Sequence, residues 1–223
     1  QMEPAKEGDL DALQRAFPAD CDATSVNRKD EDGRTALHWA AANKSRGGQR
    51  HSECVSYLIE RGAKVQTLDD GGWTPLLSAS SAGNDEVVVK LIAARADVNY
   101  VEEQGEISAL HAASSKGHAG VVRILLRAGA SIEATDRNGQ TPLHRAAGAG
   151  KADVAEVLLS DKARAAAADK EGNTPLHLAM YEQHGAVCRV LLENRASTAA
   201  KNLKGETPLA LAPDSFCAAV LEA

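Results

Sequence analysis

Aromatic side chains are scarce in this chain of 223 residues, at 3% of the sequence, although 43% of the residues are hydrophobic. The hydrophobic share argues against extended disorder. The shortage of aromatic rings and the abundance of alanine argue against one large central core. They favour a fold in which thin helices pack closely on their neighbours.

The chain also lacks the usual patterns of metal, disulfide and membrane proteins. The four cysteines are far apart, and no two form a C-x-x-C pair: Cys21, Cys54, Cys188 and Cys217. This spacing indicates neither a zinc site nor a disulfide framework, so we expect reduced thiols. There is no run of 18 apolar residues and no charged-then-apolar leader. We therefore expect a soluble protein of the cytoplasm and nucleus with no membrane contact.

Positive charge is in deficit as well, with a formal net charge of -6 and a pI of about 5.7. This balance argues against binding to nucleic acid and suits a partner that carries a basic patch. No glycine-rich phosphate loop is present, and we expect no cofactor.

What the chain does contain is a repeat. Glycine recurs at intervals of 39, 33, 34, 33 and 33 residues, at Gly33, Gly72, Gly105, Gly139, Gly172 and Gly205. Three residues before each glycine stands a lead residue: Asp30, Asp69, Glu102, Asp136, Asp169 or Asn202. After it comes a signature such as Thr141-Pro-Leu-His144, then an alanine-rich stretch and an apolar pair such as Leu158-Leu159. A period of about 33 residues predicts one structural unit stacked many times.

Each part of the unit has a physical reason. Asp-x-x-Gly is turn chemistry, because Asp binds local backbone and Gly accepts a positive φ. Thr or Ser then caps a helix, and Pro suits its first position. One turn and two antiparallel helices per unit identify the ankyrin repeat, so we predict an all-α ankyrin-repeat solenoid with β-turn fingers. We assign residues 1–34 to a partial N-terminal cap, 35–206 to five repeats and 207–223 to a C-terminal cap.

Departures from the repeat give further expectations. One extra residue near Ile107 predicts a bulge in the third finger. Six extra residues in the stretch 44–51 predict a polar surface loop between two helices. Gly83, Gly117 and Gly150 are expected as left-handed caps of first helices. At the ends of three second helices Arg95, Lys162 and Arg195 replace the usual glycine, where a left-handed conformation costs about 1 kcal/mol.

The histidines do not indicate an enzyme or a metal site. Four of them occupy one position of the signature, His38, His111, His144 and His177. There a ring is expected to bind neighbouring backbone, and successive units lie about 10 Å apart, too far to share one zinc ion. We predict no catalytic residue and no metal. An enzyme using a histidine pair is the alternative, and it requires a deep pocket.

The candidate site is a partner-binding surface on the fingers and first helices. Acidic residues crowd the first three fingers, among them Asp32, Asp69 and Asp70, with Arg34 close by. Trp39 and Trp73 are not needed by the repeat, and exposed Trp beside Arg and Asp is typical of binding hot spots. Lys116, Arg145 and Tyr181 stand at similar first-helix positions. Two alternatives stay open: the charges are ordinary solvated turns, and the tryptophans pack on the next finger.

Beyond the repeat, the chain resembles the gankyrin family of ankyrin-repeat chaperones of proteasome assembly (26S proteasome non-ATPase regulatory subunit 10). The similar segments are Asp32-Gly-Arg-Thr-Ala-Leu-His-Trp39, Asp69-Asp70-Gly-Gly-Trp73, Ser81-Ala-Gly-Asn-Asp-Glu86 and Gly172-Asn-Thr-Pro-Leu-His-Leu-Ala179. The resemblance implies that the concave face clasps the basic, helical C-terminal domain of one ATPase of the regulatory particle. It also implies contacts from Asp32, Arg34, Trp39, Asp70, Trp73 and Lys116.

One departure limits this resemblance. Animal members carry a Leu-x-Cys-x-Glu motif that recruits the retinoblastoma protein, whereas here Met180 stands in place of the cysteine in Leu178-Ala-Met-Tyr-Glu182. We therefore expect no such recruitment. We expect a monomer. A generic ankyrin adaptor, or a kinase-inhibitor-like regulator with another protein client, is the alternative function.

Overall fold

The computed structural model describes residues 2–43 and 50–221. The chain divides into two compact units, residues 1–104 and 105–223. Within the described residues both units consist of helices joined by turns and loops, without an extended strand, which confirms the all-α prediction. The domain bounds assigned from the repeat stay a prediction.

The first unit contains seven helices in its described part. They are α1 (Glu3–Glu7), α2 (Leu10–Ala16), α3 (Ala23–Val26), α4 (Ala36–Ala42), α5 (Arg50–Glu60), α6 (Pro75–Ala82) and α7 (Asp85–Ala93). The second unit contains α8 (Ala109–Lys116), α9 (Ala119–Arg127), α10 (Pro142–Gly148), α11 (Ala152–Ser160), α12 (Pro175–Tyr181), α13 (Gly185–Glu193), the 3-10 helix η1 (Pro208–Leu211) and α14 (Asp214–Leu221).

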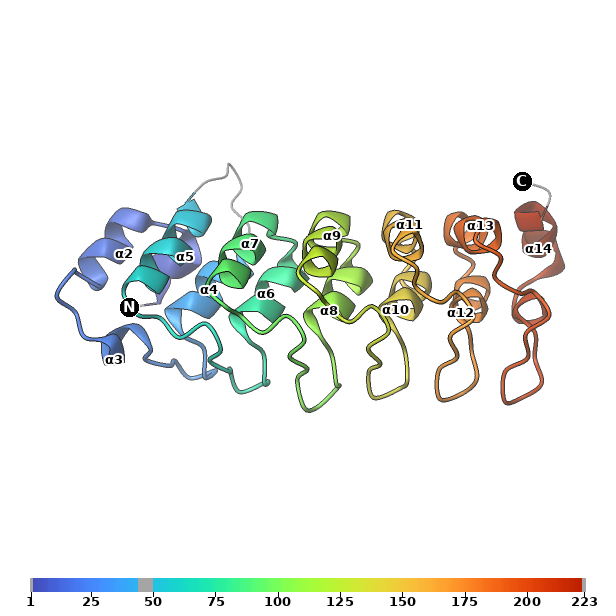
Figure 1. Cartoon of the computed structure of the whole chain (residues 1–223), viewed down its shortest axis with the longest axis horizontal. Coiled ribbons are helices and arrows are strands. Elements are labelled where there is room, and N and C mark those ends of the chain that lie inside the picture. The colour runs from blue at the N-terminus through green and yellow to red at the C-terminus, as the bar shows by residue number, and fades with distance from the viewer. Residues whose placement is uncertain (1, 44–49, 222–223) are drawn as a thin grey trace. The chain divides into compact units, whose positions relative to one another are not determined.

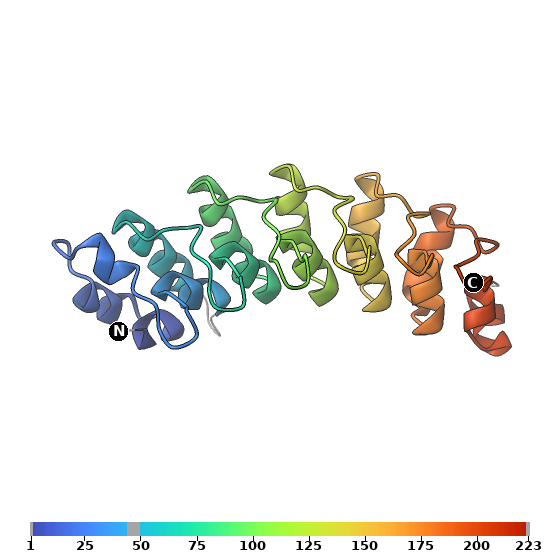
Figure 2. The same ribbon diagram turned by 90° about the horizontal axis from the view of Figure 1, so that it is seen from below.

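Within each unit the helices form two rows (Figures 1 and 2). The row nearer the fingers holds α4 and α6 in the first unit, and α8, α10 and α12 in the second; we call these the inner helices. The other row holds α5 and α7, and α9, α11 and α13, which we call the outer helices. Finger loops project beyond the inner helices in both units.

A repeated leucine holds each pair of rows together. The signature leucines of the inner helices are at most 1% exposed, at Leu37, Leu76, Leu110, Leu143 and Leu176. In the outer helices the first member of each apolar pair is fully buried, as at Leu91 and Leu158, and the second is only partly buried. Burying one such side chain contributes roughly 1.5–3 kcal/mol, so the stack is stabilised by many small, similar contributions.

Turn chemistry builds the fingers as expected. In five fingers the backbone N–H of the lead residue donates to the carbonyl four residues later, for example from Asp69 to Trp73 over 3.0 Å. Backbone hydrogen bonds also join neighbouring fingers, such as that from Asp70 N–H to the Asp32 carbonyl in the first unit and that from Lys170 N–H to the Asn138 carbonyl in the second. The finger glycines take a positive φ at Gly33, Gly72, Gly139, Gly172 and Gly205.

The third finger departs from this scheme. Gly105 does not take the left-handed conformation; Glu106, the next residue, does, with φ 56°. The extra residue therefore shifts the left-handed position by one along the chain. The prediction of positive φ at a finger glycine is wrong here, because the insertion changes which residue must turn the chain.

The predicted left-handed caps of the first helices are confirmed, and the three residues that replace glycine at second-helix ends are left-handed as well. Gly83, Gly117 and Gly150 have φ values of 73°, 85° and 71°, and Arg95, Lys162 and Arg195 have φ values of 67°, 71° and 63°. For the loop predicted over 44–51, residues 44–49 lie outside the described residues. Arg50 and His51 are the first two residues of α5, so the prediction of loop is wrong for this pair.

Candidate partner-binding surface

The lead residue of a finger organises its turn. One carboxylate oxygen of Asp30 accepts hydrogen bonds from the N–H groups of Asp32 and Arg34. The corresponding oxygens of Asp69, Asp136, Asp169 and Asn202 accept the equivalent pair of bonds. Glu102 and Asp136 are 3% and 1% exposed. The lead acids therefore hold the fingers in shape, which reduces the set of acids that face solvent.

In two repeats the second carboxylate oxygen of the lead residue reaches the inner helix of the same repeat. Trp39 donates its indole N–H to Asp30 Oδ2 over 2.7 Å. In the second unit Arg145, at the same repeat position as Trp39, donates to Asp136 Oδ2 from Nε over 2.7 Å and lies 2.5 Å away through its NH2 group. The side chain of Asp136 is fully buried, so Arg145 neutralises a buried carboxylate and has a structural role besides any role in binding.

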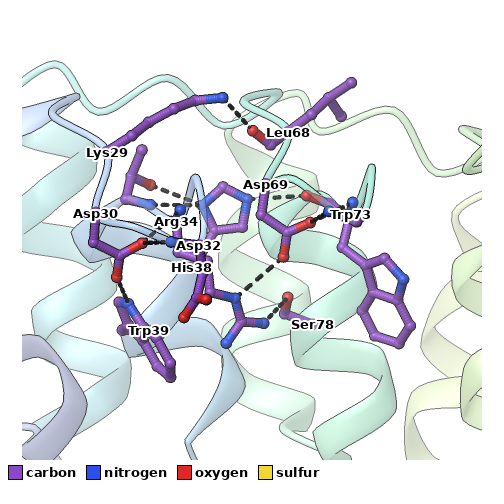
Figure 3. A network of polar contacts seen from close by, with 12 residues as sticks. Lys29, Asp30, Asp32, Arg34, His38, Trp39, Leu68, Asp69, Trp73 and Ser78 are labelled. Carbon is purple, nitrogen blue, oxygen red and sulfur yellow. Dashed lines mark hydrogen bonds and ion pairs between the residues drawn. The ribbon is translucent and has the colours of Figure 1, made fainter.

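Arg34 links the first two complete fingers (Figure 3). Its Nε donates to Asp69 Oδ2 over 3.1 Å, and its NH2 group approaches Ser78 Oγ at 3.4 Å. The side chains of Arg34 and Asp69 are only 20% and 10% exposed. Both residues were expected to contact a partner. Their charges are instead paired with each other, and Asp69 also accepts hydrogen bonds from the backbone of its own turn.

Trp39 lies in a cationic environment. The Lys6 ammonium is 4.3 Å from the centroid of its ring, and the Arg34 guanidinium carbon is 4.5 Å away. Such contacts contribute about 0.5–1 kcal/mol each at exposed sites. Burial alone would raise the pKa of the Asp30 carboxyl, but hydrogen bonds from Trp39, Arg34 and Asp32 outweigh it and lower that pKa. Trp39 is thus partly buried and internally bonded.

Trp73 differs from Trp39. Its backbone is used by the finger, because its carbonyl accepts from Asp69 N–H and contacts His38 Nε2 at 3.0 Å. Its indole extends away from the Arg34–Asp69 pair (Figure 3) and is half-buried. Asp32 and Asp70, on the neighbouring finger tips, are exposed. These three residues form the part of the predicted site that faces solvent in the first unit.

The other three predicted residues belong to the second unit. Lys116 ends α8 and is exposed, Arg145 is bonded to Asp136, and Tyr181 at the end of α12 is 64% exposed. The structure therefore groups the nine predicted residues into six on the first unit and three on the second.

The repeated histidines cap their helices. In each case Nδ1 accepts the backbone N–H of the cap residue, and Nε2 donates to a carbonyl of the next finger, as from His144 to Asn173 over 2.9 Å. His38, His111 and His177 make the same pair of contacts. Burial lowers the pKa of His38, His111 and His144 below the ordinary 6.5. Both nitrogens of each ring are therefore used by the fold.

Metal-binding clusters and membrane spans are both absent from the described part of the chain. No group of three or more His, Cys, Asp or Glu side chains there could hold a metal ion. No helix among those residues is long and apolar enough to cross a bilayer.

Sequence reasoning missed several residues of this surface. Lys6, which stacks on Trp39, comes from α1 and carries no motif. Leu178 and Glu182 line clefts of the second unit. Leu178 stands at the repeat position of Trp39 and Arg145, four residues after the helix cap, so comparison of that position across repeats could have found it.

Comparison with known proteins identifies the repeat. A family model described as ankyrin repeats (3 copies) matches residues 2–102 and 80–169, and the single ankyrin-repeat model matches residues 171–203. The chain belongs to the ankyrin-repeat family. As an ankyrin-repeat chain it is also similar over its whole length to the crystal structure of the human ASB11 ankyrin repeat domain. That similarity has a TM-score of 0.87 and 28% identity, and covers 99% of this chain and 96% of the other.

Among curated proteins, the ankyrin repeats here are similar to 26S proteasome non-ATPase regulatory subunit 10. The Dictyostelium discoideum protein is 51% identical over 61 residues, which is 27% of this chain and 24% of that protein. The human protein is 40% identical over 71 residues, 32% of this chain and 28% of that protein. The matched segments thus span about a quarter of the length of these relatives.

Proposed function

We propose that this chain is a non-catalytic protein-binding scaffold that acts as a chaperone in assembly of the 26S proteasome regulatory particle. Its client is the C-terminal domain of one ATPase of the particle's base, bound on the finger and inner-helix side. The observation that carries the proposal is the 40–51% identity to subunit 10 of the 26S proteasome in human and Dictyostelium proteins.

The first unit supports this proposal by its charge. Once the lead acids are assigned to the turns, the exposed acids of its fingers are Glu31, Asp32, Asp70 and Glu103. Of the cations beside them, Arg28 and Lys29 are exposed and Arg34 is neutralised by Asp69. Acidic tips of this kind attract a basic helical domain, speeding encounter and fixing register more than they set affinity. Finger bonds made within the unit order these tips before docking, so little entropy is lost when a partner binds.

Trp73 supplies the apolar part of the same surface. A half-buried indole beside charged residues matches the composition of binding hot spots. Trp39 contributes less, because Asp30, Lys6 and Arg34 already occupy its polar edge and its ring. The contacts of Asp69 and Arg34 assign these residues to shaping the surface. Asp32, Asp70 and Trp73 are then the residues expected to touch the client.

The proposal is tested by a pull-down with the purified C-terminal domains of all base ATPases. The test variant is Asp32→Arg with Asp70→Arg. The control variant, Glu53→Arg with Glu60→Arg, makes the same change in net charge on exposed positions of the outer helix α5 in the same unit. We expect one ATPase domain to be recovered by the wild type and the control and lost by the test variant. Equal recovery by both variants contradicts the proposed surface.

The competing function is an ankyrin adaptor with a different protein client. The similarity of the chain to the ASB11 ankyrin domain favours this function. Failure of the wild-type chain to recover any base ATPase domain favours this function. A cytoplasmic and nuclear location and a monomeric state are part of the same proposal. Fluorescence microscopy of the tagged chain and light scattering test these two points.

A further inference from the structure

The second unit departs from the repeat in the side chains that its last two repeats expose. Tyr181 stands seven residues after its helix cap, where the two preceding repeats have Ser115 and Gly148. Its side chain is 64% exposed. Leu178 and Leu211 both stand four residues after their caps, where the earlier repeats of this unit have Ala112 and Arg145. Large apolar side chains thus replace small or charged ones on one side of the unit.

These side chains line two clefts that share Leu178. One cleft of about 340 Å3 lies between α12 and η1, and its lining includes Glu171, Leu178, Tyr181, Lys204, Glu206 and Leu211. The other, of about 300 Å3, adjoins α10 and α12 and includes Arg145, Gly148, Leu178 and Glu182. Such volumes are at the low end for small-molecule sites. Each cleft has room for one large side chain of a partner.

The charge of the two clefts is negative. Carboxylates come from Glu171, Glu206 and Glu182, and an ammonium comes from Lys204. The remaining cation, Arg145, is neutralised by the buried Asp136 at 2.5 Å. Asn173 contacts Glu171 at 3.4 Å and Asn202 donates to Glu206 over 3.0 Å, so these carboxylates are held by amides and not by cations. The clefts therefore suit an incoming positive charge.

We propose that this side of the second unit is a separate docking surface for a linear protein segment. The segment places an aliphatic or aromatic anchor on Leu178, Tyr181 and Leu211, and a Lys or Arg against the neighbouring carboxylates. The helices that carry the clefts are neighbours, and adjacent helices pack about 8–10 Å apart. In an extended segment, which rises about 3.3 Å per residue, residues i and i+3 are separated by a similar distance. The surface is distinct from the acidic fingers of the first unit and does not depend on the proteasome proposal.

The test is selection of a random 16-residue peptide library, displayed on phage, against the full chain. We expect enriched peptides to pair an apolar anchor with Lys or Arg, and their fluorescein-labelled synthetic forms to bind in fluorescence anisotropy. Tyr181→Ser and Leu178→Ala are expected to weaken that binding at least tenfold each. Both substitutions install a residue that this chain already holds at the same repeat position, at Ser115 and Ala112, so the fold is preserved.

Two control variants and one charge-removing variant distinguish peptide binding at these clefts from binding elsewhere on the chain. Leu203→Ser removes an 80% exposed leucine of the same unit that does not line the cleft, and it is expected to leave affinity unchanged. Asp32→Arg with Asp70→Arg in the first unit is also expected to leave it unchanged. Glu171→Gln with Glu182→Gln is expected to weaken binding three- to tenfold at low salt. No enrichment, acidic enriched peptides, or equal losses from Leu203→Ser and Tyr181→Ser would overturn the proposal.

Discussion

Acidification is expected to destabilise the fold through its capping histidines. In His38, His111 and His144, Nδ1 accepts a backbone N–H over 3.1–3.3 Å. Protonation of Nδ1 removes that acceptor and places a charge in a buried position. Burial accordingly lowers the pKa of these three side chains below the ordinary 6.5.

The sign follows from proton linkage. Between the lowered native pKa and 6.5, the unfolded chain binds more protons than the native chain, so stability rises with pH and is lost as pH falls below about 6.5. Each histidine contributes at most about 1.4 kcal/mol per pH unit, so the three together contribute up to about 4 kcal/mol per pH unit. The free energy of unfolding should therefore fall steeply between pH 6.5 and the native pKa values.

Urea unfolding followed by circular dichroism at several pH values from 7.5 to 5.5 measures this slope. His144→Leu, which places at this position the residue type found at Leu77, is expected to lower the slope by about a third. Leu158→Val, a core substitution in the same repeat, lowers stability at every pH and is expected to leave the slope unchanged. A slope that His144→Leu does not alter, or stability that rises on acidification, would refute this reasoning.

Three further predictions concern single side chains. Ser80 and Ser114 are fully buried, and among the described residues their hydroxyls have no hydrogen-bond partner. Replacing each by Ala, the residue at the same repeat position in Ala41 and Ala147, is expected to raise the free energy of unfolding by about 1 kcal/mol in urea titration. A loss of stability would contradict this. Lys162 has a left-handed φ of 71°. Lys162→Gly is therefore expected to raise the free energy of unfolding by about 0.5–1 kcal/mol, whereas Lys162→Ala is not. Equal urea unfolding midpoints for the two variants would contradict backbone strain at this residue. Burial raises the pKa of the Cys54 and Cys188 thiols to about 11. At pH 8 we therefore expect N-ethylmaleimide to modify Cys21 and Cys217 in the folded chain, and to modify Cys54 and Cys188 only in urea, with mass spectrometry as the measurement. Equal modification rates at all four cysteines would contradict the burial.

Much of the fold could be predicted because the sequence pattern of each turn, cap and core position occurs in several repeats. Thr141-Pro-Leu-His144 specifies a cap, a helix start, a core leucine and a capping ring, and the structure has all four. Gly105 shows the limit of this reasoning. An inserted residue moved the left-handed turn to Glu106, and the pattern alone does not say which of two adjacent residues will adopt it.

The candidate site was harder to predict because one residue type serves two purposes. Asp69 and Asp70 are adjacent and identical in the sequence, yet Asp69 accepts bonds from its own turn and from Arg34, whereas Asp70 is exposed. Ser80 and Ser114 are polar side chains of inner helices, yet both are buried. Such differences depend on contacts with the next repeat, which lies some 30 residues away in the sequence.

The measurement that most directly tests the finger and inner-helix side of the first unit as a binding surface is calorimetric titration with the base ATPase domain recovered in the pull-down. Trp73→Ala is compared with Val89→Ala, which removes an apolar side chain that is 50% exposed on the outer helix α7 of the same unit. We predict that Trp73→Ala weakens binding at least tenfold and that Val89→Ala stays within twofold of the wild type. Wild-type affinity in Trp73→Ala, or an equal loss in Val89→Ala, would contradict the account.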